Sequence, residues 1–467
     1  MPEARAAFLV GSRVATGVAA LVVGAGLIAV ATFAPLPTAQ LDAPSVTVTP
    51  VPSADLVVCP GSVLRLGDES GANATSASAI GTPTIIRSAT EGEVESRALA
   101  ATDAGGGLGA PSVLSVPSAP DAGIAAAQSQ TIGTGDYRGL AVAECSAPSS
   151  DAWLVGGSTA VGRTALLTIA NPGAVSSTVS IEVYSEDGPV DAPGTAGIIV
   201  AAGSQRVLTL AGFAPSQESL AVHVTSRGGP VASSLQQSIV RGIDPGGIDI
   251  VGPTGSPATS HVIPGVRIAG TIDVQALLGL DGYADLDPVL RLLVPGGEPA
   301  AATVTITSAA DGALPGGFDI QLEPGVVTDV PLDELEDGTY SVSVESDVAV
   351  VSALRASTAA AEDVDLAWFT TASVLTGDAL IPVAAGPGAA LSLSNATTST
   401  ITATLDGQPV DVPAGAAVSL PVDDGRSYVL AGGAGLAVSV GYSGSGSLAA
   451  YAISASATEE PPVVVRP

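Results

Sequence analysis

The sequence predicts an all-β protein made of tandem antiparallel β-sandwiches of immunoglobulin-like type, preceded by an N-terminal transmembrane helix and a low-complexity insertion. Gly contributes 56 and Pro 35 of the 467 residues, so the chain is cut into short segments that disfavour long helices. Apolar and polar residues alternate within these segments, as they do in half-buried strands. The same succession of short strands also recurs three times.

The recurring segments begin after residue 150 and share one order of parts. A leucine-rich strand is followed by a Thr-Val/Ile alternating strand, two Val-rich strands and a last strand of small residues that carries Ser. This order indicates an internal repeat of about 65–80 residues. We expect one β-sandwich in each of residues 150–242, 243–358 and 359–457. A β-propeller is the alternative, although its blades of about 40–50 residues are shorter than this repeat.

The first repeat allows a core to be predicted from alternation. Residues that alternate on a strand face opposite sides of a sheet, so every second residue shares one face. The residues expected to face the core are Ile181, Val183, Leu208, Leu210, Val222 and Val224. Those expected to face solvent are Glu182, Thr209 and His223.

The N-terminus predicts export. Residues 14–34 carry no charge and follow Arg5 and Arg13, and about 20 apolar residues suffice to cross a bilayer. Arginines on that side keep residues 1–13 in the cytoplasm and place residues 40–467 outside. A cleaved signal peptide is the alternative, because Ala29-Val30-Ala31 fits a small-x-small cleavage site and would release a secreted protein. Two further segments complete this reading, a Pro-rich spacer at 35–53 and a tail at 458–467.

The two cysteines predict a disulfide in the exported part of the chain. Cys59 and Cys145 each follow a short apolar run, and an isolated pair in an oxidising compartment favours a disulfide over a metal site. The bridge would close residues 54–149 as a strand pair. Between the two strands, residues 67–135 are rich in Ala, Ser, Gly and Pro, so we expect a poorly ordered insertion there.

Charge and composition exclude several classes of function. The formal net charge is −30, and such a surface repels the phosphate backbone, so nucleic acid is not expected as a partner. All 15 basic residues are Arg. Lysine chemistry, including a Schiff base and a phosphate-loop lysine, is therefore absent.

The stretch GSTAVGRT at 157–164 resembles the phosphate-binding loop G-x-x-x-x-G-K-[ST]. A true phosphate loop joins a strand to a helix, whose N-terminus holds the phosphates. Here Arg163 replaces the lysine and Thr164 runs into ALLTIANPG, which has the composition of a strand. We therefore predict a turn that enters a β-sandwich, with no nucleotide.

No pattern points to a catalytic, cofactor or metal site. His223 is predicted at the surface, and GYSGSGS at 441–447 has Ser445 where a hydrolase motif requires Gly. Two acidic clusters offer oxygen atoms for calcium but match no calcium loop, so solvated turns are the simpler interpretation. They comprise Asp281, Asp285 and Asp287, and Asp333, Glu334, Glu336 and Asp337.

The aromatic residues allow two interpretations. Trp153 and Trp368 each precede a repeat, and a lone Trp in a β-domain is typically part of the core. The alternative is an exposed sheet face that stacks against sugar rings. The residues of that possible glycan contact are Trp368, Phe369, Tyr428 and Tyr442.

Residues 145–190, with Trp153-x-x-Gly156-Gly157 and the earlier Cys59-Pro60-Gly61, resemble an actinobacterial family of uncharacterised, membrane-anchored exported proteins. Members of that family are often encoded near enzymes of envelope polysaccharide assembly. The resemblance implies an envelope location and adds no activity.

We therefore expect a non-enzymatic exported envelope protein that acts as a spacer, scaffold or protein-interaction module at the cell surface. Its partner would be an envelope protein or a cell-wall polysaccharide. A polysaccharide-binding module is the alternative function, and an exported hydrolase is a second, weaker alternative.

Overall fold

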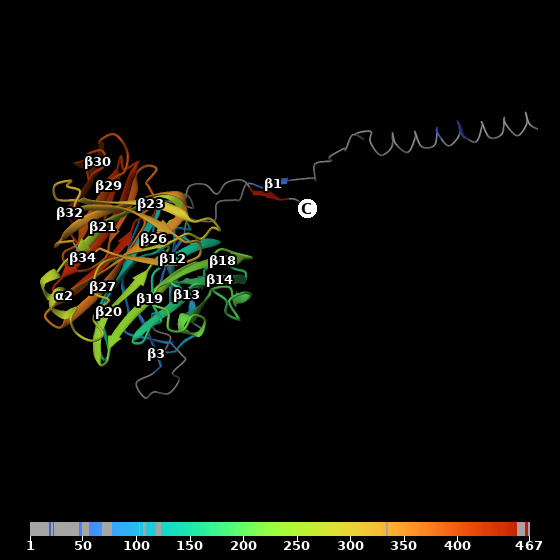
Figure 1. Cartoon of the computed structure of the whole chain (residues 1–467), viewed down its shortest axis with the longest axis horizontal. Helices are drawn as coiled ribbons and strands as arrows, with labels where there is room; N and C mark the ends of the chain where they lie inside the picture. Colours follow the sequence, from blue (N-terminus) through green and yellow to red (C-terminus); the bar gives the residue numbers. More distant parts are fainter. Residues whose placement is uncertain are drawn as a thin grey trace, which may run out of the picture. The chain divides into compact units, whose positions relative to one another are not determined.

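A computed structural model describes the chain over most of its length. It covers residues 18–19, 22, 46–48, 56–67, 77–101, 103–105, 109–117, 123–332, 335–454 and 463–465. Residues 51–460 form one compact unit (Figure 1). The other unit, residues 1–50 with 461–467, contains the strand pair β1 (Val46–Val48) and β36 (Val463–Val465). The prediction of an all-β fold is confirmed.

The predicted membrane segment 14–34 lies outside the described residues except for three positions. Most of the spacer 35–53 and of the tail 458–467 lies outside them too. Among the residues that are described, no helix has the length and apolar character that a membrane crossing requires.

Three consecutive stretches each contribute two sheets. The first stretch contains β12 (Asp151–Val155), β13 (Arg163–Asn171), β14 (Ser177–Ser185), β15 (Gly188–Val190), β16 (Ile198–Val200), β17 (Ser204–Thr209), η1 (Leu210–Gly212), β18 (Leu220–Arg227), β19 (Ala232–Arg241) and β20 (Asp244–Val251). The second contains β21 (Ala258–Ile268), α2 (Thr271–Leu277), β22 (Val289–Leu293), β23 (Ala300–Ser308), β24 (Gly316–Leu322), β25 (Thr328–Pro331), β26 (Gly338–Ala360) and β27 (Asp363–Thr370). The third contains β28 (Ala379–Val383), β29 (Ala390–Asn395), β30 (Ile401–Leu405), β31 (Gln408–Val412), β32 (Ala417–Pro421), β33 (Arg426–Ala431), β34 (Leu436–Gly444) and β35 (Ser447–Ala452).

The strand order is the same in all three stretches. In one sheet the strand order is β12-β18-β14-β15 in the first stretch, β21-β26-β23-β24 in the second and β28-β33-β30-β31 in the third. In the other sheet the order is β20-β19-β13-β17 in the first stretch, β27-β26-β22-β25 in the second and β35-β34-β29-β32 in the third. The long strand β26 serves both sheets of the second stretch, because its first half pairs with β21 and β23 and its second half with β22 and β27.

A shorter stretch precedes these three. Its strands are β2 (Leu56–Cys59), β3 (Leu64–Leu66), β4 (Ala77–Ala79), β5 (Thr84–Ala89), β6 (Glu95–Ala98), β7 (Ala100–Ala101), β8 (Ala104–Gly105), β9 (Ser112–Ser115), β10 (Ile124–Thr134) and β11 (Tyr137–Glu144). The insertion predicted to be poorly ordered, 67–135, thus contains β4 to β10. That prediction is wrong for the described residues, because β5 pairs with β10 over six positions and β9 with β2 over four.

Four hairpins meet at the centre of the unit, and their last strands form a ring. β11 packs beside β20 and β35, and β27 packs beside the same two strands. Figure 1 shows β20 and β27 side by side. Each of these four strands is the edge of its own sheet and is hydrogen-bonded to the first strand of its hairpin only. We call β11, β20, β27 and β35 the strand ring.

The hydrophobic cores link the stretches into a closed circuit. The core of the first stretch includes Val351 and Leu366 from the second, and the core of the second includes Leu448 from the third. The core of the third includes Leu140 of the N-terminal stretch, and a further cluster joins that stretch to Ile248 in the first. Burial of apolar surface therefore holds every stretch to its neighbours, the first and last included.

The predicted core of the first repeat is mostly confirmed. Five of its six residues are buried in one cluster, namely Ile181, Val183, Leu210, Val222 and Val224. Leu208 is only partly buried against that cluster. Glu182 is exposed, whereas Thr209 and His223 are half-buried rather than fully exposed.

The predicted disulfide joins Cys59 to Cys145, whose Cα atoms are 4.1 Å apart. Cys59 ends β2, and Cys145 follows directly after the ring strand β11. Beside the bridge, the backbone N–H of Val58 donates to the Ser146 carbonyl over 2.8 Å and the reverse bond measures 3.1 Å. The disulfide therefore fastens β2 to the end of the ring strand β11.

Replacing both cysteines, in C59S/C145S, should lower the stability of the compact unit. The bridge spans 86 residues, and closing such a loop removes unfolded-state entropy worth about 4–5 kcal/mol. Denaturant unfolding of the double variant beside the oxidised wild type measures the difference. An unchanged unfolding midpoint would show that the bridge contributes nothing.

A candidate binding site at the end of the strand ring

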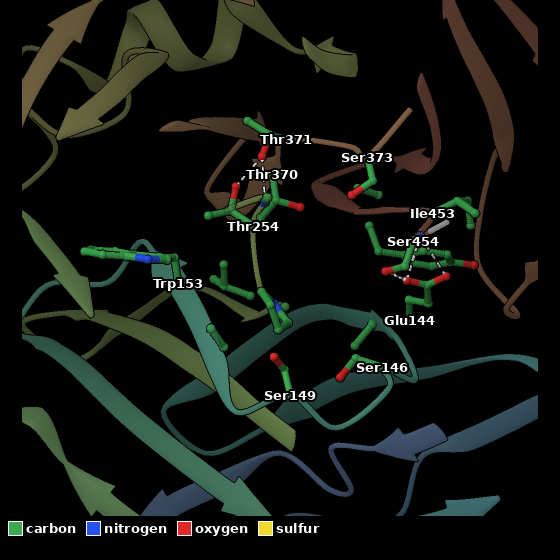
Figure 2. Close-up of a pocket in the computed structure, with 18 of the residues that line it drawn as sticks. Glu144, Ser146, Ser149, Trp153, Thr254, Thr370, Thr371, Ser373, Ile453 and Ser454 are labelled. Carbon is green, nitrogen blue, oxygen red and sulfur yellow. Dashed lines mark hydrogen bonds between the residues drawn. The ribbon is translucent and has the colours of Figure 1, made fainter. Parts of the chain in front are cut away.

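A pocket lies where all four ring strands end. Its lining includes the last residues of β11, β20, β27 and β35 together with the segments that follow them, and its volume is about 240 Å³ (Figure 2). Hydroxyl groups dominate the polar part of this lining. They belong to Ser146, Ser149, Thr254, Ser256, Thr370, Thr371, Ser373 and Ser454.

Several of these hydroxyls are held in place by the backbone. Thr254 Oγ1 donates to the Ser352 carbonyl over 3.2 Å and shares a hydrogen bond with Thr371 Oγ1. Thr371 Oγ1 also accepts the N–H of Gly255 over 2.9 Å. The wall that β20 and β27 supply is therefore fixed before any ligand arrives.

Two tryptophans contribute the apolar wall. Trp153 lies on the opposite side of the pocket from Glu144 and Ser454 (Figure 2). Its indole stacks on the imidazole of His223, with ring centroids 4.2 Å apart and planes only 6° from parallel. Trp368 donates its indole N–H to Gln237 Oε1 over 2.7 Å. Both rings are thus immobilised, which lowers the entropic cost of binding against them.

Glu144, the last residue of β11, supplies a carboxyl group. Its oxygens accept the Ser454 hydroxyl over 2.6 Å and the Ser454 N–H over 3.1 Å. Burial raises the pKa of Glu144 to about 7, although the bonds from Ser454 act in the opposite direction. Near neutral pH this group can therefore either accept or donate a hydrogen bond.

Two further carboxyl groups lie inside the ring, and sequence reasoning missed both. Asp249 of β20 accepts the N–H of Trp368 over 2.7 Å, and Asp365 of β27 accepts N–H groups from all four ring strands. Burial raises the pKa of Asp365 to about 7, and it raises that of Asp249 well above the ordinary value with a contribution from Asp365. The signal in the sequence is an acid in the middle of an apolar strand, in GIDIV and DVDLAW.

The predicted glycan contacts do not form an exposed face. Trp368, Phe369, Tyr428 and Tyr442 are exposed by only 2%, 2%, 7% and 1%. Phe369 packs in the core of the second stretch and the two tyrosines in that of the third. The interpretation as an exposed, sugar-stacking face is therefore wrong, and the core interpretation of Trp153 and Trp368 is confirmed. Of the four predicted glycan contacts, only Trp368 lines the pocket at the end of the strand ring.

The stretch GSTAVGRT is a turn, as predicted. Residues 156–160 have no regular structure, a turn follows at Val161 and Gly162, and β13 begins at Arg163. Gly162 has a φ of 76° and lies against the Val240 carbonyl, where a side chain would collide with that oxygen. Arg163 forms an ion pair with Asp285 over 2.7 Å.

At least two members of the acidic clusters have partners within the protein, whereas Asp281 and Glu336 are exposed. Asp285 binds arginines, and Asp337 accepts the N–H groups of Gly270 and Thr271 at the start of α2. Asp333 and Glu334 lie outside the described residues. Within the described part of the chain, no group of three or more His, Cys, Asp or Glu residues is arranged to hold a metal ion.

Comparison with known proteins gives a family and no activity. Residues 100–433 match a family described as "Family of unknown function (DUF5719)". A solved structure titled "Crystal Structure of Thermotoga maritima 1070" is 21% identical over 25% of this chain and 95% of that one. Its TM-score of 0.21 is too low to support an argument. No curated protein matches the chain.

The raised pKa of Glu144 predicts how pH changes stability. Because its folded pKa exceeds the ordinary carboxyl value, the stability that it contributes is fully present below that ordinary value and is lost as pH rises through about 7. E144Q stays neutral, so its melting temperature should rise relative to wild type between about pH 5 and about pH 8.

The exposed Glu298, between β22 and β23, provides the matched control. E298Q measures the effect of losing one exposed carboxyl group at each pH, and the rise for E144Q should exceed it. A difference between E144Q and wild type that grows no more with pH than that of E298Q would contradict the raised pKa of Glu144.

Proposed function

This chain belongs to the DUF5719 family of unknown function, and we propose that it is a non-enzymatic exported scaffold of the cell envelope. The closed circuit of hydrophobic cores supports the proposal, because it joins four stretches into one body that can present a surface without internal hinges. The pocket at the end of the strand ring is the surface that this body would present.

An extracytoplasmic location forms part of the proposal. A disulfide in the folded protein favours an oxidising compartment, and the charge of −30 suits a soluble body outside the membrane. We further propose that residues 14–34 anchor the chain in the membrane of an actinobacterium. On this proposal the three stretches are β-sandwich repeats, and their common strand order supports that reading.

A second candidate function is the binding of a cell-wall polysaccharide, and the pocket lining favours it. Neutral sugars present hydroxyls that both donate and accept hydrogen bonds, as the serines and threonines of the pocket do. Sugar rings also present apolar faces that pack on flat aromatic walls such as Trp153. A volume of about 240 Å³ suits one sugar unit or the end of a chain.

Filling the mouth of the pocket tests the polysaccharide candidate. Ser373 is an exposed residue of the lining, so S373W should obstruct entry without disturbing a core. Co-sedimentation of residues 40–467 with purified cell-wall sacculi should then weaken by about tenfold or more, and the binding should persist at high salt. T398W, at an exposed turn beyond β29, is the matched control and should bind like wild type.

Each outcome discriminates between the functions. If S373W binds sacculi as wild type does, the pocket is not the site that binds the polysaccharide. If wild-type protein does not sediment at all, cross-linking from position 373 in intact envelopes should capture a protein partner that position 398 does not capture. Failure of both experiments would contradict the scaffold proposal.

A further inference from the structure

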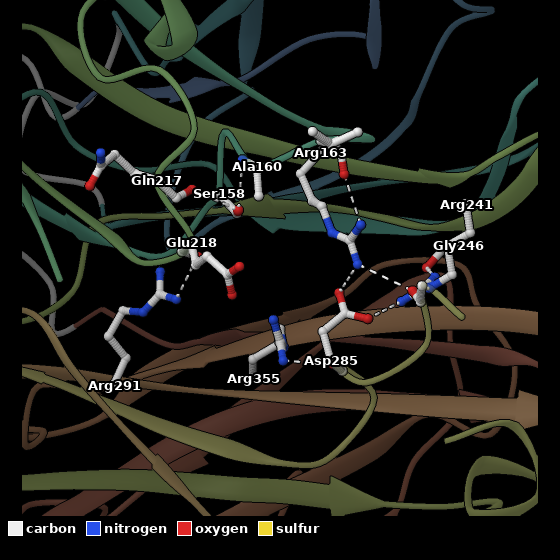
Figure 3. A network of polar contacts seen from close by, with 12 residues as sticks. Ser158, Ala160, Arg163, Gln217, Glu218, Arg241, Gly246, Asp285, Arg291 and Arg355 are labelled. Carbon is white, nitrogen blue, oxygen red and sulfur yellow. Dashed lines mark hydrogen bonds and ion pairs between the residues drawn. The ribbon is translucent and has the colours of Figure 1, made fainter. Parts of the chain in front are cut away.

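We infer that a cluster of four arginines, between the first and second stretches, forms a binding site for an oxyanion, that is a phosphate, sulfate or carboxylate group. The guanidinium groups come from four different strands and lie close to the aspartates Asp285 and Asp329. Figure 3 shows Asp285 with Arg163, Arg241 and Arg355 around it. The arginines are Arg163 of β13, Arg241 of β19, Arg291 of β22 and Arg355 of β26. This site is separate from the pocket at the end of the ring.

The two carboxylates of the cluster are already engaged. Asp285 accepts Arg163 over 2.7 Å with one oxygen and Arg241 over 2.8 Å with the other. Asp329 accepts Arg291 through both of its oxygens, at 2.7 and 2.8 Å, and also the hydroxyl of Ser219. Among these six side chains, four guanidinium groups face two carboxylates, which is an excess of two positive charges.

This imbalance differs from the other ion pairs of arginine in the described structure. Arg138, Arg206 and Arg426 each pair with a single aspartate, Asp363, Asp103 and Asp406 in that order. In a chain with a net charge of −30, an excess of buried positive charge is unexpected. Concentrating charge of one sign in a partly buried place is costly unless a counter-ion compensates it.

Arg355 is the arginine of this cluster that forms no ion pair with a carboxylate. Arg355 is only 8% exposed. Its Nη2 donates a hydrogen bond to the backbone carbonyl of Asp285. Its Nε is buried and has no hydrogen-bond partner. A buried donor left without an acceptor costs about 1–3 kcal/mol, and more when it is charged. An oxyanion bound there would accept this donor and offset the excess charge.

The cluster reaches solvent on the sides of its aspartates. The side chains of Asp285, Asp329 and Arg163 are 22%, 28% and 17% exposed, whereas that of Arg291 is only 1% exposed. Arg291 is moreover saturated by its carbonyl acceptors and by the Trp368 ring, 4.7 Å from its guanidinium carbon. Arg291 is therefore a structural contact, and Arg355 with Arg163 would hold the anion.

The chemistry of these groups selects the class of ligand. A guanidinium presents paired N–H donors whose spacing matches two oxygens of a phosphate, sulfate or carboxylate. A chloride ion offers no such pair of acceptors. Glu218, whose backbone carbonyl accepts Arg291, is exposed at the same edge and would oppose a large polyanion. The site therefore suits a single oxyanion group.

Phosphate, sulfate and acetate titrations at constant ionic strength test the inference, with the melting temperature and calorimetric heat as readouts. Wild-type protein should show a saturable rise in melting temperature with at least one oxyanion, and none when chloride replaces it. The order of phosphate, sulfate and acetate identifies the preferred group. R355M should bind that group about tenfold more weakly or not at all.

Two variants complete the design. R426M removes an exposed arginine from a one-to-one ion pair and should bind the oxyanion like wild type. S373W should also bind it normally, which separates this site from the ring-end pocket. R355K keeps the positive charge but loses the paired N–H donors of the guanidinium group. It should therefore bind the oxyanion with an affinity between those of wild type and R355M. If R355M does not fold, R355K and the wild-type titration decide.

The inference fails if wild-type protein shows no saturable response to any of the three oxyanions, or if R355M and R355K respond as wild type does. A response lost equally in R426M would assign the effect to general screening of charge.

Discussion

Asp365 is the residue around which the strand ring is organised. Its carboxylate accepts one backbone N–H from each ring strand, those of Leu140, Ile248, Leu366 and Leu448, over 2.9 to 3.2 Å. The four strands are edges of their sheets, so their inward N–H groups have no ladder partner. Buried N–H groups must be paired, and one carboxylate inside the ring pairs four of them.

The close approach of the strands to Asp365 requires glycine at two positions. A Cβ on Gly139 would lie 2.4 Å from Asp365 Oδ1, and one on Gly247 would lie 2.8 Å from the Leu366 nitrogen. Both residues also have positive φ angles, 142° and 110°, which other residues rarely adopt. Glycine thus allows β11 and β20 to reach the carboxylate. The ring in turn brings four strand ends together, and those ends form the candidate pocket.

The sequence predicts core residues correctly where one face of a strand is buried and the other face is exposed to solvent. Alternation identified Ile181 and Val183 as core residues, and the isolated cysteine pair in a chain expected to be exported predicted the bridge between Cys59 and Cys145. Alternation fails in the ring, because strands such as β27 are covered on both faces. The alternative of an exposed aromatic face at Trp368 and Phe369 fails for this reason, since both residues are buried.

Partners that lie far apart in the sequence were also beyond prediction. Asp285 belongs to an acidic cluster that looks solvated, yet its partner Arg163 lies 122 residues earlier in the chain. Asp249 and Asp365 were overlooked because each acquires its donors only when the ring closes. The alternation of apolar and polar residues within a strand indicates which face is apolar. It does not indicate which other strand will cover that face.

Amide hydrogen exchange of D365A beside wild type tests the role of Asp365 most directly. Removing the carboxylate leaves four buried N–H groups unpaired, at a cost of about 1–3 kcal/mol each. We expect the amides of Leu140, Ile248, Leu366 and Leu448 to lose protection together, although they belong to four different hairpins. Loss of protection at Leu366 alone, with the other three amides unchanged, would contradict the claim that one buried carboxylate holds the ring closed.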